Sequence, residues 1–480
     1  MDKSRVSVLW FRQDLRIADN PALIEACKDS SIVPIYILDD KSAGDWKYGA
    51  ASRWFLFEAL TDLNKLLDNQ LLFFEGDASE VLIDIVKEVG AESVYWNRCY
   101  EPWAIERDSR IKKSLKALNI SVQSFNSSLL WEPWAVLKKD GTPYKVFTPF
   151  YRKGCLVSSA PRMPLEIPSN INCVAFEGSK SLSELGLRPK NNWYKKFENI
   201  WDVSSDGVAA KLRGFLDEGL DVYREGRNFP SKKYVSALSP YLRFGMISPN
   251  MVWYAAISEK TSKSEDRNLD TFLSELGWRE FSYYLLYHFP QLPSQNLQSK
   301  FDAFPWHKDP YDMLEIWEKG LTGYPLVDAG MRELYQTGYM HNRLRMVVGS
   351  FLVKNLLIDW REGEKWFWDC LVDADLASNS AGWQWIAGCG ADAAPYFRIF
   401  NPITQSEKFD SEGAYIRKYV PELSKLPSKY IHAPWQAPEE ILKDNNVELG
   451  VTYPLPIVDI KESRQAALEA FSRTKLQVQA

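Results

Sequence analysis

Five short apolar runs alternate with amphipathic stretches along the first 125 residues. The runs occupy residues 6–11, 32–38, 71–74, 93–96 and 120–123. Helical patterns, such as the one over residues 52–67, separate them. Apolar strands that alternate with helices are typical of a parallel sheet with helices on both faces. We therefore predict that residues 1–130 form a doubly wound α/β domain.

The hydrophobic pattern changes twice in the rest of the chain. Residues 131–200 lose clear periodicity, and the stretch 158–169 is rich in Ser and Pro. This composition predicts an interdomain connector. From residue 201 to residue 480, apolar residues recur at spacings of three and four, which predicts an all-helical second domain.

Polar residues follow the predicted strands, where a ligand of a doubly wound sheet binds. They are Arg12, Gln13, Asp14, Arg16, Asp39, Asp40, Asn97 and Arg98. No G-x-G-x-x-G sequence follows the first strand, although that sequence is the usual mark of a dinucleotide there. We expect the first domain to hold a different cofactor or none.

Length and composition narrow the class of protein. A chain of 480 residues with 45% hydrophobic residues favours two domains. The six cysteines form no C-x-x-C pair, which predicts a reduced, cytoplasmic protein without a metal cluster. No apolar run approaches the ~18 residues of a membrane span, so we expect no membrane association. With a net charge of −5, any DNA binding requires a local basic face.

The stretch 373–402 is the most informative part of the sequence. It crowds two carboxylates, an amide, two indoles and a cation among small residues: Asp373, Asp375, Asn379, Trp383, Trp385 and Arg398. Such a mixture suits a place where backbone and polar groups approach a large flat ligand. Together with residues 323–332 and 340–346, the stretch resembles the flavin-binding core of the photolyase/cryptochrome family.

The resemblance implies that the helical domain binds FAD, which is fully reduced when the protein is active. The residues that match the family's cofactor contacts are Tyr223, Arg227, Val235, Ser236, Ala237, Leu238, Ser239, Phe272, Glu275, Arg279, Asn342, Arg345, Asp373, Asp375 and Asn379. Hydroxyls and amides that open a helix suit a pyrophosphate, although Ser residues alone also read as helix caps. The family often has Thr where this chain has Val235.

Four of these residues carry specific expectations. By residue type, Asp373 and Asp375 can form a general acid/base pair, but beside Arg345 and a flavin we expect them to bind the cofactor. The resemblance implies an ion pair between Arg345 and Asp373. Asn379 matches the residue that faces flavin N5. Plant cryptochromes usually have Asp at this position and animal ones commonly have Cys, so Asn favours repair over signalling.

The resemblance also implies contacts with damaged DNA. Glu275, Trp278 and Arg279 share one helical face, which by itself indicates a surface ion pair beside a packed indole. In the family, the Glu hydrogen-bonds the damaged bases and the Trp stacks on them. The other expected DNA or lesion contacts are Asn342, Arg343, Met346, Trp385 and Arg398. Met346 favours cyclobutane dimers as the substrate, because family members that act on (6-4) photoproducts usually have His at this position.

Three further indoles match the tryptophan chain that carries electrons from the surface to the flavin. They are Trp306, Trp360 and Trp383. Without the resemblance, core packing would explain all of them better, since Trp is most often buried area. Trp385 lies about 200° around a helix from Trp383, and we expect it to face the lesion cavity instead.

We predict a light-dependent cyclobutane pyrimidine dimer photolyase of class I or class III, which acts on DNA as a monomer. A cryptochrome is the first alternative; Asn379, Met346 and the lack of a long C-terminal extension disfavour it. A single-strand or (6-4) specific relative and a non-catalytic nucleotide-binding protein are the others. A second antenna chromophore stays open between a folate, a deazaflavin and a flavin. Trp103 and Ala104 stand where some class I members have a folate-binding Asn-Glu pair.

Overall fold

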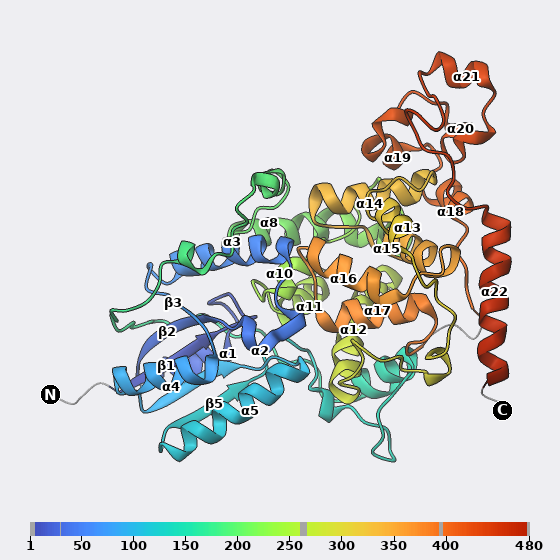
Figure 1. Cartoon of the computed structure of the whole chain (residues 1–480). Helices are drawn as coiled ribbons and strands as arrows, with labels where there is room; N and C mark the ends of the chain where they lie inside the picture. The colour runs from blue at the N-terminus through green and yellow to red at the C-terminus, as the bar shows by residue number, and fades with distance from the viewer. Residues whose placement is uncertain (1–4, 29, 260–265, 393–396, 478–480) are drawn as a thin grey trace. The chain divides into compact units, whose positions relative to one another are not determined.

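The computed structural model describes residues 5–28, 30–259, 266–392 and 397–477 (Figure 1). The chain divides into two compact units. The first consists of Met1–Asp221, Ser236–Pro290 and Val372–Ala377, and the second of Val222–Val235, Gln291–Leu371 and Ser378–Ala480. This division is based on contacts in space, and the domain limits 1–130, 131–200 and 201–480 stay a prediction.

The first unit contains the predicted parallel sheet. Its strands are β1 (Val6–Phe11), β2 (Ser31–Leu38), β3 (Leu72–Glu75), β4 (Ser93–Asn97) and β5 (Ser121–Phe125). They pair in the order β3-β2-β1-β4-β5, and every pair is parallel. The change of direction after β3 is that of a doubly wound sheet. The α/β fold class is thus confirmed, and each strand lies within two residues of its prediction.

Helices cover the sheet because each connection between parallel strands must cross over. They are α1 (Pro21–Ala26), α2 (Asp40–Ala43), α3 (Ala50–Leu66), α4 (Ala78–Val89) and α5 (Pro102–Ala117). On one face, a core of buried residues joins the strands to α4 and α5, with Trp10 and Trp96 in edge-to-face contact at 5.8 Å between ring centroids. These indoles supply much of the buried area that holds this layer together.

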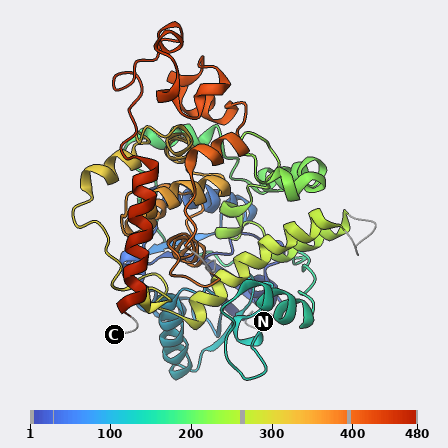
Figure 2. The same cartoon turned by 90° about the vertical axis from the view of Figure 1, so that its right-hand side faces the viewer.

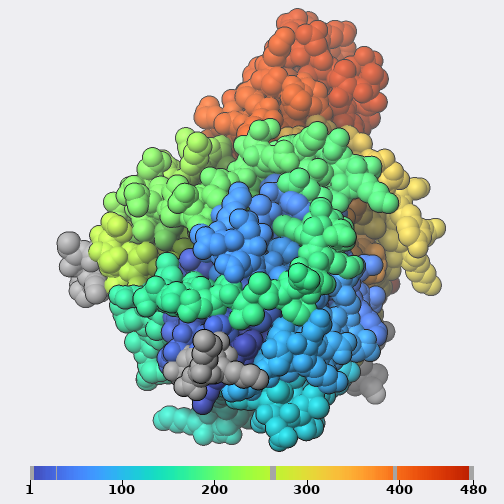
Figure 3. Space-filling model, turned by 90° about the vertical axis from the view of Figure 1, so that its left-hand side faces the viewer, coloured from blue at the N-terminus to red at the C-terminus, as the bar shows by residue number. Residues whose placement is uncertain are grey.

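The predicted connector packs against the sheet instead of standing free. Cys173 forms an isolated bridge with Ile32, and Lys180 forms one with Phe73. In Figure 3 the green connector lies across the blue α/β part. The other helices of the first unit are α6 (Phe147–Pro149), α7 (Lys195–Glu198), α8 (Ser205–Gly214), α10 (Ser239–Arg243), α11 (Pro249–Ser258) and α12 (Arg267–His288). The 22-residue helix α12 is yellow-green in Figure 2.

The second unit is built from helices, as the 3.6-residue pattern predicted. They are α9 (Tyr223–Gly226), α13 (Tyr311–Glu318), α14 (Pro325–Thr337), α15 (Asn342–Ser350), the π-helical turn η10 (Phe351–Asn355), α16 (Trp360–Cys370), α17 (Leu376–Ala387), α18 (Pro402–Phe409), α19 (Ala414–Tyr419), α20 (Ser428–Ile431), α21 (Glu439–Asp444) and α22 (Ile460–Gln477). Helix α17 begins in the last residues of the first unit. No helix of the described residues is long and apolar enough to cross a membrane.

Candidate functional site

The predicted site residues fall into two sets, one in each unit. The first unit holds Ser236, Ala237, Leu238, Ser239, Phe272, Glu275, Trp278, Arg279, Asp373 and Asp375. The second holds Tyr223, Arg227, Val235, Trp306, Asn342, Arg343, Arg345, Met346, Trp360, Asn379, Trp383, Trp385 and Arg398. Each set is described by itself.

In the first unit, the start of α10 is tied to the acidic segment 372–377. The Ser239 hydroxyl donates a hydrogen bond to Asp373 Oδ2 at 2.6 Å. Arg243, at the end of the same helix, donates from Nε to the Ala374 carbonyl at 2.7 Å. Two residues before α10, Ala237 has a φ of 49°, in the left-handed region that a non-glycine residue adopts only when its surroundings enforce it. This part of the predicted pyrophosphate segment is therefore held in one shape.

Asp375 has a buried partner that the sequence analysis missed. The Tyr283 hydroxyl donates to Asp375 Oδ2 at 2.5 Å, and burial followed by the Asp375 charge raises the pKa of Tyr283 well above its ordinary value. Tyr283 therefore stays a donor at any physiological pH. Its spacing gave a usable signal, because Glu275, Arg279 and Tyr283 follow one another at four-residue steps along α12.

Helix α12 presents Trp278 with one ring face already covered. The ring of Phe147, from the connector, stacks on the Trp278 indole at 3.8 Å with an angle of 10° between the planes. Arg279 donates to the Ser128 carbonyl at 2.7 Å, so it binds the end of the predicted α/β domain, just before the connector. Only the face of Trp278 opposite Phe147 can stack on a base, and Phe147 fixes the orientation of that face.

In the second unit, Asn379 is oriented by the helix packed beside it. Its Nδ2 donates to the backbone carbonyl of Glu364 at 3.0 Å, which leaves Oδ1 to accept a hydrogen bond from a ligand. Ser380 donates to the side chain of Glu364, and burial raises the pKa of this carboxyl to about 8. A neutral acid thus lies behind Asn379 at pH 7.

The three indoles of the predicted electron chain differ in their exposure. Trp383 and Trp360 are buried, whereas Trp306 is partly exposed. The Trp306 ring packs on the Phe304 ring, with 4.3 Å between the ring centroids. Trp360 Nε1 donates to Asn296 Oδ1 at 2.9 Å. A Cβ at Gly363 would lie 2.1 Å from Cη2 of Trp383, so glycine is required for α16 to approach this ring.

Helix α15 carries four of the predicted residues, and His341 caps its N-terminus. His341 Nδ1 accepts a hydrogen bond from the Arg343 backbone N–H at 3.2 Å. Burial, followed by the charges of nearby arginines, lowers the pKa of His341 to about 4. The imidazole is therefore neutral at pH 7 and keeps its acceptor. Arg345 Nε donates to the Met340 carbonyl at 2.8 Å.

Arginines gather around Arg343. Its guanidinium donates to Asn228 and lies 4.4 Å from the ring centroid of Phe409. Burial, then the charges of Arg227 and Arg398, lowers the pKa of Arg343 below its ordinary value. Mutual repulsion of this kind costs stability unless an anion relieves it. Arg227 and Arg398 therefore lie near enough to act on the charge of Arg343, although the net charge of the chain is negative.

The comparison with known proteins identifies the family. The family model described as DNA photolyase matches residues 7–168, and the FAD binding domain of DNA photolyase matches residues 272–473. A deoxyribodipyrimidine photo-lyase of Agrobacterium fabrum is 47% identical over 481 residues, which cover 98% of this chain and 99% of that protein. The chain belongs to the photolyase/cryptochrome family.

Both branches of the photolyase/cryptochrome family occur among the similar proteins. Cryptochrome-2 of Arabidopsis thaliana is 38% identical, with 99% of this chain and 80% of that protein covered. The crystal structure of a bacterial class III photolyase from Agrobacterium tumefaciens matches with a TM-score of 0.94 at 46% identity, covering 99% of this chain and 98% of that one. The FAD-binding match includes Asn379 and the three indoles of the predicted electron chain, and it begins after Ser239.

The polar residues at the carboxyl ends of the strands are largely bound to one another. Arg12 Nη1 lies 2.7 Å from Asp108 Oδ2, and the Arg107 guanidinium lies between the rings of Trp10 and Trp103, at 4.8 and 5.0 Å from their centroids. Asn97 donates to Asp14 at 2.6 Å. In this photolyase-family sheet, much of the usual ligand edge is filled by the protein's own side chains.

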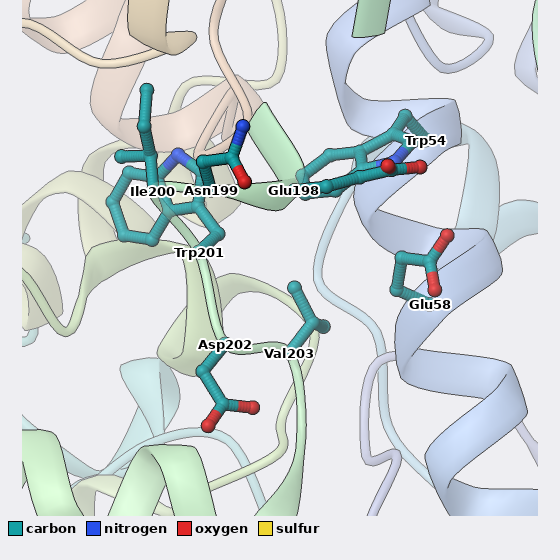
Figure 4. Close-up of a pocket in the computed structure, with 8 residues that line it drawn as sticks. All are labelled: Trp54, Glu58, Glu198, Asn199, Ile200, Trp201, Asp202 and Val203. Carbon is teal, nitrogen blue, oxygen red and sulfur yellow. The ribbon is translucent and has the colours of Figure 1, made fainter. Parts of the chain in front are cut away.

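A separate cavity of about 540 Å³ lies in the first unit (Figure 4). Its lining consists of Trp54, Glu58, Glu198, Asn199, Ile200, Trp201, Asp202 and Val203. Figure 4 shows Trp54 and Trp201 on different sides of it. None of the residues matched to the flavin or the lesion lines this cavity, so it is distinct from the predicted catalytic residues.

Proposed function

We propose that this protein is a light-dependent DNA repair enzyme that splits cyclobutane pyrimidine dimers. The observation that carries the proposal is the match, over nearly the whole of both chains, to proteins named deoxyribodipyrimidine photo-lyase from Agrobacterium fabrum and, at 38% identity, from Escherichia coli. The orientation of Asn379 agrees with it.

The described residues fit a bound flavin. When bound, fully reduced FAD would supply, on excitation, the electron that opens the cyclobutane ring and would take it back, so the reaction would have no net redox change. Asn379 Oδ1 would accept from the flavin N5–H, because its Nδ2 is held by the Glu364 carbonyl. Ser239 and Asp373, already hydrogen-bonded to each other, bind the phosphate and ribityl parts. Tyr283 and Arg243 hold the acidic segment in place.

The DNA substrate is bound by stacking and by charge. Trp278, backed by Phe147, stacks on the flipped dimer, while Glu275 and Met346 contact the edges of its bases. Flipping is cheapest where pairing is already weakened, as at a dimer. Arg343 and Arg398 neutralise backbone phosphates. Burial, followed by the charges of Arg227 and Arg398, lowers the pKa of Arg343.

Trp383, Trp360 and Trp306 would carry electrons to an oxidised flavin. The order of burial supports this proposal, because the first two indoles are enclosed and Trp306 is partly exposed. An enclosed indole is shielded from solvent, whereas the last member of a relay must meet an external reductant. Trp385, in the same helix as Trp383, contacts the lesion instead.

A second, light-harvesting chromophore belongs to the same proposal. Its identity stays open between a folate, a deazaflavin and a flavin. The cavity between Trp54 and Trp201 is our candidate for its site, because aromatic walls suit a flat ring. The absorption spectrum of protein from its native source, before and after Trp201→Ala, tests both points.

We further propose that the protein acts as a cytoplasmic monomer with the domain limits 1–130, 131–200 and 201–480. None of the six cysteines, all of which lie in the described residues, forms a disulfide, which agrees with a reducing compartment. Sedimentation of the purified protein tests its oligomeric state, and limited proteolysis tests the domain limits.

A photorepair assay separates this function from the cryptochrome alternative. Purified protein with reduced FAD is mixed with an oligonucleotide that carries one thymine dimer, and intact thymines are counted after blue light and after darkness. Repair in light alone is expected. A protein that binds FAD and fails to repair under these conditions is a signalling cryptochrome, and Asn379 and Met346 have then been misinterpreted.

A further inference from the structure

Lys354 is buried at a place where no catalytic role requires a lysine. It lies in the π-helical turn η10 and is only 3% exposed. Its Nζ donates to the backbone carbonyl of Arg398 and lies 4.2 Å from the ring centroid of Phe397. Among the described residues, no carboxylate forms an ion pair with it. Burial lowers the pKa of Lys354 to about 7, which shows how unfavourable an ammonium is at this site.

Burying a charge without a counter-ion destabilises a fold. A lysine in this position therefore needs a structural or functional role that offsets this cost. The contacts of Lys354 indicate such a role, because they fix the backbone of one short segment. Lys354 holds the carbonyl of Arg398, and Ser350, one turn earlier, accepts a hydrogen bond from the Phe400 N–H at 3.2 Å. The backbone of residues 398–400 is therefore fixed at two points by one helical stretch.

The segment matters because of the side chain that it carries. Arg398 is exposed, and its charge reaches Arg343, whose pKa it lowers. A long exposed arginine loses conformational freedom when it binds a phosphate, and a fixed backbone reduces that loss. The contacts of Lys354 thus act on Arg398, and through its charge on Arg343. Lys354 itself is buried and cannot reach DNA.

We propose that Lys354 is a positioning residue for DNA binding, which fixes the main chain of Arg398 so that its guanidinium meets a backbone phosphate. The inference rests on the proposed function, in which Arg398 binds DNA. Lys354 acts through Arg398 alone, so its effect must vanish when the Arg398 guanidinium is absent.

A double-mutant cycle tests this directly. Dissociation constants for dimer-containing DNA are measured as a function of salt for wild type, Lys354→Met, Arg398→Ala and the double variant, each loaded with FAD. Methionine keeps the apolar stem and removes the donor. We expect Lys354→Met alone to weaken binding by about three- to tenfold and to reduce the salt slope by up to about one unit. In the Arg398→Ala background it should change neither quantity.

The neighbouring residue provides a matched control. Asn355 is buried in the same turn and donates from Nδ2 to Ser463 Oγ at 2.9 Å. Asn355→Ala removes a buried hydrogen bond of similar location and should lower the thermal midpoint while leaving DNA affinity unchanged. Repair by the preformed complex should be unaffected in Lys354→Met, so the loss appears in KM and not in kcat.

The outcomes distinguish the inference from the function on which it rests. Wild-type affinity in Lys354→Met, or equal losses in the presence and absence of Arg398, overturns the positioning role. An Arg398→Ala variant with normal affinity also overturns it, while repair by wild type in light leaves the proposed function standing. If Lys354→Met does not retain FAD, Lys354→Gln is measured in its place; its shorter side chain keeps a donor. Its effect on DNA affinity is then compared in the presence and absence of Arg398→Ala, and this comparison tests the positioning role.

Discussion

At the scale of the residue, the site depends on which atoms of a side chain are already engaged. Asn379 has its Nδ2 fixed by the Glu364 carbonyl, so its oxygen remains for the flavin contact that we propose. Trp278 has one ring face covered by Phe147, so one face remains for a base. In both cases the fold occupies one of the two binding surfaces of the side chain and leaves the other one oriented. Such preorganisation lowers the free-energy cost of binding.

Met346 allows a test of substrate preference by one residue. We expect Met346→His to lower the rate of dimer repair by about tenfold or more, equivalent to ~1.4 kcal/mol of lost transition-state stabilisation, and to leave the FAD content unchanged. The measurement is repair of a thymine-dimer oligonucleotide together with the flavin absorbance. Full repair activity would refute the lesion contact, whereas loss of flavin would give Met346 a structural role.

Glu364 makes stability depend on pH. Its carboxyl has a pKa of about 8 in the fold and ~4.3 when unfolded, so between these values only the folded state holds the proton. The contribution of Glu364 to stability must therefore fall as pH rises from about 5 to 8. We expect Glu364→Gln to reduce this fall, as measured by the thermal midpoint at pH 6 and pH 8.5. Identical pH profiles for both proteins would show that the carboxyl is ionised in the fold.

At the scale of the element, α15 presents the residues matched to the lesion and the DNA from its first two turns. His341 caps this helix with an imidazole that burial, followed by the charges of the arginines after it, keeps neutral. The cap and the charges thus support each other. Helix α16 similarly depends on Gly363, because any side chain there would overlap the Trp383 ring.

Removal of the cap should loosen the start of α15. We expect His341→Ala to destabilise the protein by ~1 kcal/mol and to weaken binding of dimer-containing DNA about threefold, because Arg343 lies in the first turn. His341→Asn, which retains a capping acceptor, should restore most of both losses. Ser204→Ala removes the cap of α8 and serves as a control that costs stability without affecting DNA. Equal affinity in all these variants would separate the cap from DNA binding.

At the scale of the whole molecule, photoreduction and repair use different routes. Photoreduction needs a relay to solvent, whereas repair needs only a reduced flavin beside the dimer. We expect Trp383→Phe to bind FAD and fail to photoreduce it with an external reductant present. After chemical reduction without oxygen, it should repair dimers at close to the wild-type rate.

Trp385→Phe is the matched comparison for this prediction. It should photoreduce normally and bind or split the lesion less well. Time-resolved flavin absorbance and the repair assay, run on both variants, check the pair of expectations. Photoreduction of Trp383→Phe at the wild-type rate would mean that the relay does not begin at this residue, and the mapping of Trp360 and Trp306 would then be wrong as well.

The sequence by itself determined the fold class, the five strands, the helical second half and the family. Strand and helix periods are local properties that burial imposes on neighbouring residues, and the run 373–402 is dense enough to identify a flavin protein. The tertiary structure decided which distant side chains meet: Phe147 with Trp278, Tyr283 with Asp375, Lys354 with Arg398. Such contacts depend on how the elements pack together, and no local pattern in one segment records the position of another.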